Sequence, residues 1–280
     1  MALSGIVIYK MLPQTNCKDC GFPTCLAFAM KLAAKQVELS ACPHVSEESK
    51  AKLSESAAPP IRLVTLSSNG AEVKAGNEVV LFRHEKTFYN MPGLFIRVRD
   101  DQPVEQIKET ATAVDAYSVN YVGIDLVLDG FAIQSESGDP QSFKAAVTAV
   151  REASERPMIL IGDDPEVIAA GLDGLDGKGV LIYAATEENW EQMAALAKEH
   201  GSPLAVSGKS LEALAELTEK VKGAGVEDLV IDPGVRGFSS TLTYDTQIRR
   251  LALKKNFRAL GYPTIAFPCD AGDPGLESML

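Results

Sequence analysis

The sequence of 280 residues lacks long apolar segments. No run approaches the roughly 18 consecutive apolar residues of a transmembrane helix, so we expect no membrane-spanning segment. The opening stretch MALSGIVIYKMLP has neither a cationic lead-in nor a small-residue cleavage site, so we expect no secretory signal peptide. The expected location is therefore the cytoplasm, where clustered cysteines more often hold metal than form disulfides.

Positive charge is also scarce. The chain has 27 lysines and arginines against 38 acidic residues, which gives a net charge of −11. Because phosphate recognition requires clusters of basic side chains, this balance argues against a nucleic acid as partner. Residues 1–57 carry six lysines and five acidic residues, so the acidity belongs to the rest of the chain.

Several catalytic signatures are missing as well. The sequence contains no P-loop, no Gly-x-Gly-x-x-Gly motif and no Ser/His/Asp arrangement, and it has only three histidines. Cysteine is rare, with five residues in the chain, but four of the five lie within the first 42 residues. The most informative part of the sequence is therefore its N-terminal segment.

Residues 1–57 are predicted to form a compact helical head. The stretch SESAAPPIR at 54–62 is small, polar and rich in proline, which is typical of a linker. Residues 58–92 then comprise the linker and a β-hairpin, because short apolar runs there are separated by Asn69-Gly70.

Residues 93–280 alternate short apolar runs with amphipathic stretches of helical length. Repeated strand–helix units predict parallel strands joined by right-handed crossovers. The stretch at 119–129 is ambiguous between an extension of a neighbouring strand and a short extra strand. Seven strands fit either an open doubly wound sheet or a shortened barrel, and the pattern alone does not decide. The seven candidate strands are Leu94–Val98, Phe131–Gln134, Met158–Ile161, Val180–Tyr183, Leu204–Val206, Leu229–Ile231 and Thr264–Phe267.

The clustered cysteines have the spacing Cys17-x2-Cys20-x4-Cys25-x16-Cys42. Three interpretations compete: structural thiols, a structural zinc site and an iron–sulfur cluster. Zinc sites tend to draw their ligands from two short paired knuckles, whereas these cysteines are grouped as three plus one. A four-iron, four-sulfur cubane takes one thiolate for each iron, and the observed grouping favours it.

The residues around Cys25 predict the start of a helix. Thr24 is a candidate N-cap, and Leu26 and Met30 then share one helical face. A helix N-terminus presents backbone N–H donors, which stabilise an anionic centre such as a cluster.

Five stretches carry a family resemblance: GIVIYKMLPQTNCKDCGFPTCLAFAMKLA, ACPHVSEESKAKL, LFRHEKTFYN, LIYAATEENWEQMAALAKEHGSPLAV and LVIDPGVRGFSSTLTYDTQIRRLALKKNFRALGYPTIA. With the segments between them, they resemble the large (gamma) subunit of the corrinoid iron–sulfur protein of the acetyl-CoA decarbonylase/synthase complex. The resemblance extends in order over essentially the whole chain. It implies an α/β fold in which a small helical 4Fe–4S domain precedes an incomplete TIM-type (β/α) barrel of about seven strands at 93–280.

The resemblance also implies a function in methyl transfer. Such a subunit carries a methyl group from a methyl-tetrahydropterin and its methyltransferase to acetyl-CoA synthase, in the reductive acetyl-CoA pathway of carbon fixation. The chain is then a methyl carrier for a 5-methyltetrahydropterin:corrinoid/iron–sulfur protein Co-methyltransferase, without catalytic residues of its own. The resemblance makes Cys17, Cys20, Cys25 and Cys42 the ligands of a 4Fe–4S cluster that reduces Co(II) corrinoid to Co(I).

The partners implied by the resemblance are a small barrel subunit in a heterodimer, the methyltransferase, and the CO dehydrogenase/acetyl-CoA synthase. The family's large subunit continues further, completing its barrel and adding a C-terminal corrinoid-binding domain. The resemblance therefore predicts that the present chain is a truncated large subunit. Corrinoid binding is then expected through the missing domain and the partner subunit.

Two other functions remain open from the sequence. One is a pterin-binding methyltransferase barrel with an electron-transfer cluster, because IDPGVRGF at 231–238 resembles the Asp-Pro-Gly turn of pterin-binding barrels. Asp232 would bind the pterin there, although a plain strand-to-helix turn also explains the motif. The other is an electron carrier whose barrel only docks partners. His44 lies beside Cys42 and is a candidate neighbour of the cluster.

Overall fold

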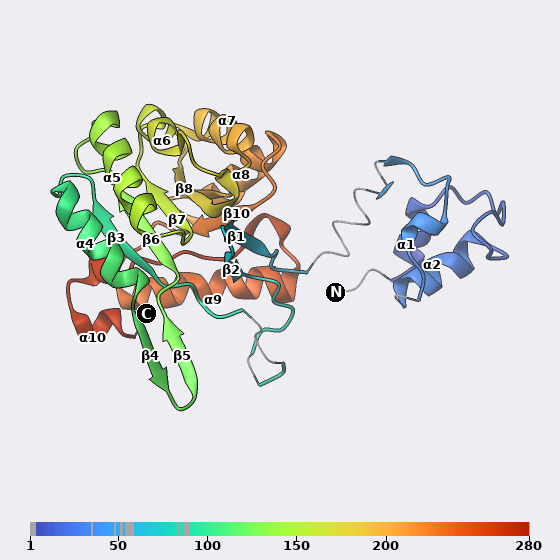
Figure 1. Ribbon diagram of the computed structural model, residues 1–280. Helices are drawn as coiled ribbons and strands as arrows, with labels where there is room; N and C mark the ends of the chain where they lie inside the picture. The colour runs from blue at the N-terminus through green and yellow to red at the C-terminus, as the bar shows by residue number, and fades with distance from the viewer. Residues whose placement is uncertain are drawn as a thin grey trace. The chain divides into compact units, whose positions relative to one another are not determined.

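A computed structural model describes residues 4–34, 36–47, 49–50, 53, 59–82, 84–86 and 90–279. The chain divides into two compact units, Met1–Pro59 and Pro60–Leu280, which are described separately here (Figure 1). Most of the predicted linker, residues 54–58, lies outside the described residues, and so does the predicted domain boundary at 57/58. None of the helices in the described ranges is both long and apolar enough to cross a membrane.

The first unit is built around two short helices, α1 (Gly5–Met11) and α2 (Cys25–Ala33), followed by the 3₁₀ turn η1 (Leu39–Ala41). Thr24 caps α2 as predicted, because its hydroxyl accepts a hydrogen bond from the backbone N–H of Ala27. The small core of this unit contains side chains from both helices and from the segment after η1. Its buried members are Ile8, Leu12, Cys25, Phe28, Ala29, Cys42, Val45 and Leu53.

The buried face of α2 differs from the apolar face expected from the sequence. Leu26 and Met30 are 44% and 56% exposed, whereas Phe28 and Ala29 are almost fully buried. Phe28 and Ala29 face the small core that α2 shares with α1 and with the segment after η1. Leu26 and Met30 lie outside this core and remain on the surface of the unit.

The second unit contains a sheet of six parallel strands in which neighbours in the sheet are also neighbours in the chain. A parallel bridge pairs Thr264 with Ile231 of the last strand, so the segment around Thr264 lies where a seventh strand would be. A strand order that never reverses is the order of a (β/α) barrel and not of a doubly wound sheet, so the predicted incomplete barrel is confirmed. The strands are β3 (Phe95–Arg99), β6 (Gly130–Gln134), β7 (Met158–Ile161), β8 (Val180–Ala185), β9 (Leu204–Ser207) and β10 (Leu229–Asp232).

Helices cover the outer face of this sheet (Figure 1). Their starts follow local capping rules, as in α6, where Asp164 is the N-cap and Pro165 the first helical residue. The apolar stripe of α8, with Leu214, Leu217 and Val221, is buried against the strands. The helices are α4 (Val104–Asp115), α5 (Pro140–Ala153), α6 (Pro165–Leu172), α7 (Trp190–His200), α8 (Leu211–Gly223), α9 (Phe238–Lys255) and α10 (Pro274–Glu277).

Two antiparallel hairpins lie outside the sheet. The first joins β1 (Val64–Ser68) to β2 (Ala71–Ala75) through the predicted turn at Asn69-Gly70. The second joins β4 (Ser118–Tyr121) to β5 (Ile124–Val127), so the ambiguous stretch at 119–129 forms a hairpin of its own.

The hairpin β1–β2 packs against the inner face of the barrel sheet. Val64 and Leu66 belong to a second core with the inward-facing residues of the strands, such as Ile159, Leu181 and Val230. The close approach of the hairpin explains Gly179, which lies just before β8: a Cβ atom there would be 2.7 Å from the Cβ of Ser68. Because Gly179 precedes β8, the hairpin packs at the amino-terminal end of the strands and leaves their carboxyl ends free.

We expect Leu66→Ala to lower the free energy of unfolding of the barrel unit by about 2–5 kcal/mol, because it removes a buried side chain from the inner core. The matched control is Leu63→Ala, whose side chain is 39% exposed and should change stability by about 0.5 kcal/mol or less. Urea unfolding followed by circular dichroism measures both. Equal stability of Leu66→Ala and wild type would show that the hairpin is not part of the barrel core.

Candidate functional site

The four predicted cluster ligands all lie in the first unit, on two segments. Cys17 and Cys20 are in the loop between α1 and α2, Cys25 is the first residue of α2, and Cys42 follows η1. Cys25 and Cys42 are buried in the small core, Cys20 is half-buried and Cys17 is exposed. The thiols thus extend from the interior of the unit to its surface.

The backbone of the cysteine loop is held in an unusual conformation. Gln14, Asn16, Lys18 and Gly21 all have positive φ, between 50° and 79°. Only glycine adopts this region without a steric penalty, so the loop needs compensating contacts. One such contact is the side-chain oxygen of Asn16, which accepts a hydrogen bond of 2.8 Å from the backbone N–H of Cys25. This bond joins the loop to the start of α2.

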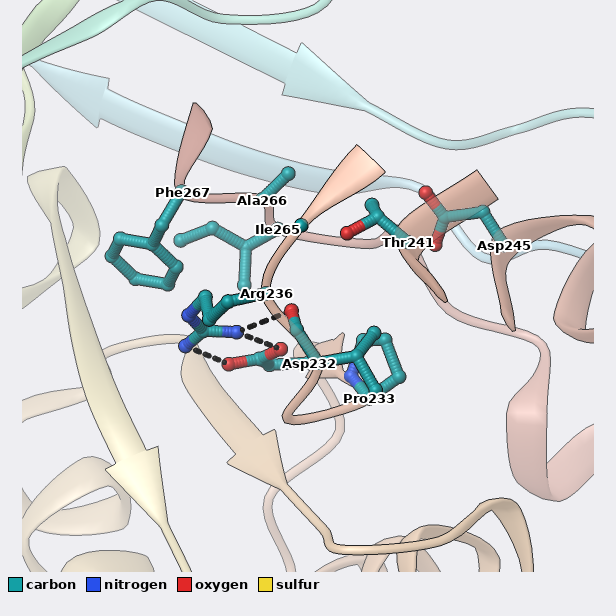
Figure 2. A pocket seen from close by; sticks show the side chains of 10 residues that line it. Asp232, Pro233, Arg236, Thr241, Asp245, Ile265, Ala266 and Phe267 are labelled. Atoms are coloured by element: carbon teal, nitrogen blue, oxygen red, sulfur yellow. Dashed lines mark hydrogen bonds and ion pairs between the residues drawn. The ribbon is translucent and has the colours of Figure 1, made fainter. Parts of the chain in front are cut away.

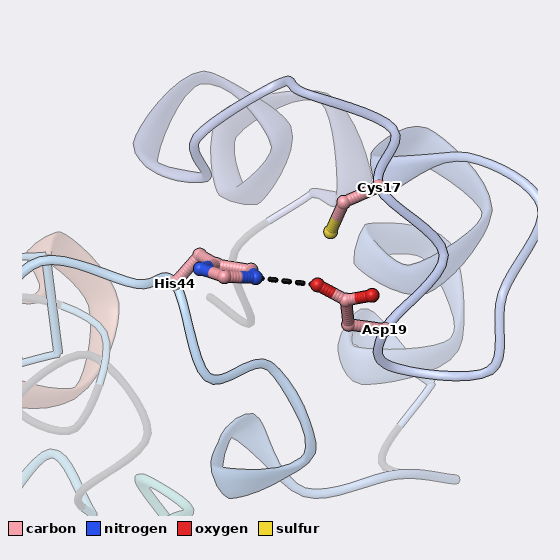
Figure 3. A group of neighbouring side chains, drawn as sticks. All are labelled: Cys17, Asp19 and His44. Carbon is pink, nitrogen blue, oxygen red and sulfur yellow. Dashed lines mark hydrogen bonds and ion pairs between the residues drawn. The ribbon is translucent and has the colours of Figure 1, made fainter.

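A second contact joins the loop to the segment that carries Cys42. The ring nitrogen Nε2 of His44 lies 2.5 Å from Oδ2 of Asp19, as Figure 3 shows. Hydrogen bonds from His44, and then from Cys17, lower the pKa of Asp19. The ligand atoms of Cys17, Asp19 and His44 lie within 4.8 Å of one another. The sequence placed His44 near the site, but it gave no reason to pair it with Asp19.

The donor set of the first unit suits an iron–sulfur cluster. Four thiols, Cys17, Cys20, Cys25 and Cys42, come from two segments of one small unit. A four-iron cubane takes one thiolate for each iron, and thiolate is the ligand that such clusters prefer.

The barrel unit has a separate polar site at the carboxyl ends of its strands. Asp232, the last residue of β10, is 1% exposed, and a buried carboxylate requires partners. It accepts hydrogen bonds from the hydroxyl of Tyr183 at 2.5 Å, the backbone N–H of Gly234 at 2.8 Å and both terminal nitrogens of Arg236 at 2.9 and 3.1 Å. Figure 2 shows the guanidinium of Arg236 facing this carboxylate.

The same guanidinium connects to a second acidic group. Arg236 lies over the ring of Phe267, 4.7 Å from its centroid, and its Nε is 3.5 Å from Asp270. Asp270 also pairs at 2.8 Å with Arg97, which comes from β3. The network thus connects the first and last strands of the sheet through charged side chains.

The environment of this network shifts its pKa values. Burial, and then the charge of Asp232, raise the pKa of Tyr183, so its hydroxyl stays protonated and donates to the carboxylate. Burial alone would lower the pKa of Arg236, but its hydrogen bonds and the charge of Asp232 raise it overall. Tyr183 and Arg236 therefore stay protonated and donate to Asp232.

Sequence reasoning found Asp232 but not its partners. The sequence did contain a signal for Tyr183, which carries a polar group within the otherwise apolar strand β8 and faces the inside of the barrel. The signal for Arg236 was its position four residues after Asp232, across the turn. Neither signal shows which residues meet, because Tyr183 and Asp232 are 49 positions apart in the chain.

A further carboxylate lines the pocket beside this network. Asp245 comes from α9 and shares the pocket with Asp232, Arg236 and Thr241 (Figure 2). Among the described residues, no hydrogen bond or ion pair to the Asp245 side chain is found. Burial, and then the charge of Asp232, raise its pKa from 3.8 to about 6.

This shift predicts a pH dependence of stability. Because the pKa of Asp245 is higher in the folded chain, the folded state binds its proton more tightly, and stability falls as pH rises from about 4 to about 6. We expect Asp245→Asn to be more stable than wild type at pH 7 and to lose this advantage near pH 4. Melting temperatures at pH 4 to 7 measure the difference. A difference that stays constant over this range would contradict the shift.

Comparison with known proteins gives two family matches. Residues 63–278 match a family model described as "CO dehydrogenase/acetyl-CoA synthase delta subunit". Residues 12–44 match a model described as "Putative Fe-S cluster", and this range contains the four clustered cysteines. Each of the two units therefore has a family match of its own.

Individual relatives extend over both units. The corrinoid/iron–sulfur protein large subunit of Moorella thermoacetica is 45% identical over 266 residues, which cover 95% of this chain and 60% of that protein. The acetyl-CoA decarbonylase/synthase complex subunit gamma 2 of Methanosarcina mazei is 38% identical over 283 residues, with 98% and 60% coverage. The chain thus spans about 60% of the length of these curated relatives.

Among solved structures, dihydropteroate synthase from Xanthomonas albilineans in complex with 7,8-dihydropteroate matches 71% of this chain and 76% of that chain, at 15% identity and a TM-score of 0.41. The named relatives confirm the resemblance to the corrinoid iron–sulfur protein large subunit that the sequence predicted. On the match over residues 63–278, the chain belongs to the CO dehydrogenase/acetyl-CoA synthase delta subunit family.

Proposed function

We propose that the chain forms part of a corrinoid iron–sulfur protein, which carries a methyl group from a methyl-tetrahydropterin and its methyltransferase to acetyl-CoA synthase in the cytoplasm. The observation that carries this proposal is the joint match of both units, in order, to a corrinoid/iron–sulfur protein large subunit. The match over the cysteine segment supports an iron–sulfur function for the first unit.

We propose Cys17, Cys20, Cys25 and Cys42 as the four ligands of a 4Fe–4S cluster. When bound, such a cluster supplies single electrons, which in this system restore Co(I) corrinoid from Co(II). Burial of Cys25 and Cys42 keeps water from one side of the site, while the exposed Cys17 leaves the opposite edge at the surface. An exposed edge is what a one-electron carrier needs to exchange electrons with another molecule.

The surrounding residues position these ligands. Asn16 fixes the first turn of α2, and thereby Cys25, against the loop. The Asp19–His44 pair joins the segment of Cys17 and Cys20 to the segment of Cys42. Neighbouring groups of this kind orient metal ligands and typically contribute 10- to 100-fold to affinity.

We assign corrinoid binding to the part of the family protein that this chain does not span and to a small barrel partner subunit, with which the chain forms a heterodimer. The barrel mouth gives no reason to place the corrinoid there, because Asp232, Arg236 and Tyr183 pair with one another. The same pairing disfavours the alternative of a pterin-binding barrel, since the oxygens of Asp232 are already engaged. Calorimetry with methyl-tetrahydrofolate tests that alternative, and heat of binding at a 1:1 ratio would revive it.

We expect Cys20→Ala to lose the four-iron cluster while the barrel unit stays folded, because the two units have separate cores. The measurements are iron and acid-labile sulfide content, the paramagnetic resonance signal of the reduced protein, and the melting temperature. The matched control is Cys269→Ala, which removes an exposed thiol of the barrel unit and should retain the cluster. Wild-type protein prepared without oxygen that holds stoichiometric zinc and no iron would refute the cluster.

We expect His44→Ala to speed the release of iron to a chelator by about tenfold or more, because it removes the bond between the two ligand segments. The paramagnetic signal of freshly reduced protein should keep the shape of the wild-type signal, because His44 is not a ligand. His84→Ala, an exposed histidine of the other unit, is the control. An altered signal in His44→Ala would instead make His44 a ligand.

A further inference from the structure

The hairpin β4–β5 has an amphipathic structure whose apolar face is exposed to solvent. Its register pairs Val119 with Leu126 and Tyr121 with Ile124, and these four side chains lie on one face of the ribbon. All four are exposed, from 43% for Val119 to 67% for Tyr121. Figure 1 shows the hairpin, labelled β4 and β5, projecting from the barrel. Residues 118–127 are called the arm below.

The opposite face of the arm has the composition expected of a surface facing water. It carries three polar residues, Ser118, Asn120 and Asp125, beside Val127 at the base, and the amide of Asn120 donates a hydrogen bond of 2.7 Å to Asp125. Alternation of apolar and polar residues along a strand normally indicates that the apolar face packs against a core. Here the apolar side of the alternation has no partner within the described part of the chain.

The arm is held at its base, so its exposed face is presented in a fixed direction. Arg156 donates to the backbone carbonyls of Asp115 and Leu128, which lie just before and just after the arm. The carboxylate of Asp115 receives further bonds from Arg156 and from the hydroxyl of Ser154. A two-stranded ribbon by itself is only marginally stable in water. The bonds at the base therefore hold the arm in a form that is ready to bind a partner.

The tip of the arm is also unusual. Val122 and Gly123 form a two-residue turn with φ values of 51° and 80°. A β-branched residue is strained at positive φ, and asparagine is the usual choice at this position. Val122 is nevertheless 85% exposed, so the strain brings no burial within this chain. An exposed apolar residue at such a position fits a tip that contacts another protein.

The charge of the arm and of the whole chain distinguishes three kinds of partner: a lipid surface, a second copy of the chain and a different protein. The arm carries one charged residue, Asp125, and no basic residue, so an anionic lipid surface offers it no attraction. The whole chain has a net charge of −11, which opposes close pairing of two identical copies. These observations favour a different protein with an apolar docking surface.

We propose that the apolar face of the arm, Val119, Tyr121, Ile124 and Leu126, docks onto the small barrel subunit. This inference rests on the heterodimer of the proposed function and names the surface that forms it. The barrel of this chain matches a family described by a delta subunit, while its named relatives include gamma subunits. Two kinds of subunit thus match one barrel, so a complex that contains both offers the arm a partner of related fold.

The test converts the apolar face to a polar one without removing the arm. Tyr121→Lys combined with Ile124→Glu places opposite charges at directly paired positions, which preserves the hairpin. The matched control is Ser118→Lys with Val127→Glu, another directly paired position on the other face. Each variant of the full chain is mixed with the small barrel subunit from the same organism, and affinity is measured by calorimetry and sedimentation velocity.

We expect the Tyr121/Ile124 variant to bind the small subunit at least about tenfold more weakly than wild type, and the Ser118/Val127 variant to bind like wild type. Unchanged melting temperature and iron content show that both variants fold. Equal binding by the Tyr121/Ile124 variant would overturn the docking surface and leave the heterodimer intact. Failure of wild type itself to bind would remove the heterodimer from the proposed function. Self-association of wild type that the Tyr121/Ile124 variant abolishes would assign the arm to a second copy instead.

Discussion

A parallel sheet buries both of its faces, and the organisation of the barrel unit follows from this constraint. The outer face is covered by the helices that connect successive strands. The inner face requires other material, and the hairpin β1–β2 supplies it at one end through Val64 and Leu66. At the other end the inward-facing positions are polar, and Tyr183, Asp232 and Arg236 satisfy one another. The two ends of the barrel therefore use different chemistry for the same requirement.

Much of the barrel was predictable because it depends on local signals. Short apolar runs marked the strands, Asn69-Gly70 marked a hairpin turn, and Asp164-Pro165 marked a helix start. The choice between an open sheet and a barrel was not predictable from these signals, because it depends on strand order and not on strand composition. The partners of Asp232 were not predictable either, since their contact comes from the closure of the sheet.

The first unit shows a different limit of sequence reasoning. Its cysteines were found by spacing, and Thr24 by the capping rule. The pairing of Asp19 with His44 was not found, because it joins two irregular segments that have no periodic pattern. The face of α2 that packs into the core could not be predicted, because apolar periodicity identifies a stripe but not its neighbour. In so small a unit, Cys25 and Cys42 themselves occupy positions that larger domains give to aliphatic side chains.

The clamp formed by Arg156 has a consequence for how this family diversifies. One guanidinium holds the points at which the chain leaves and rejoins the barrel, so both lie at one place on its surface. Segments with adjacent ends tolerate changes in length and composition with little effect on the fold that carries them. Changes within the ten residues of the arm can therefore alter the surface that it presents and leave the supporting scaffold intact.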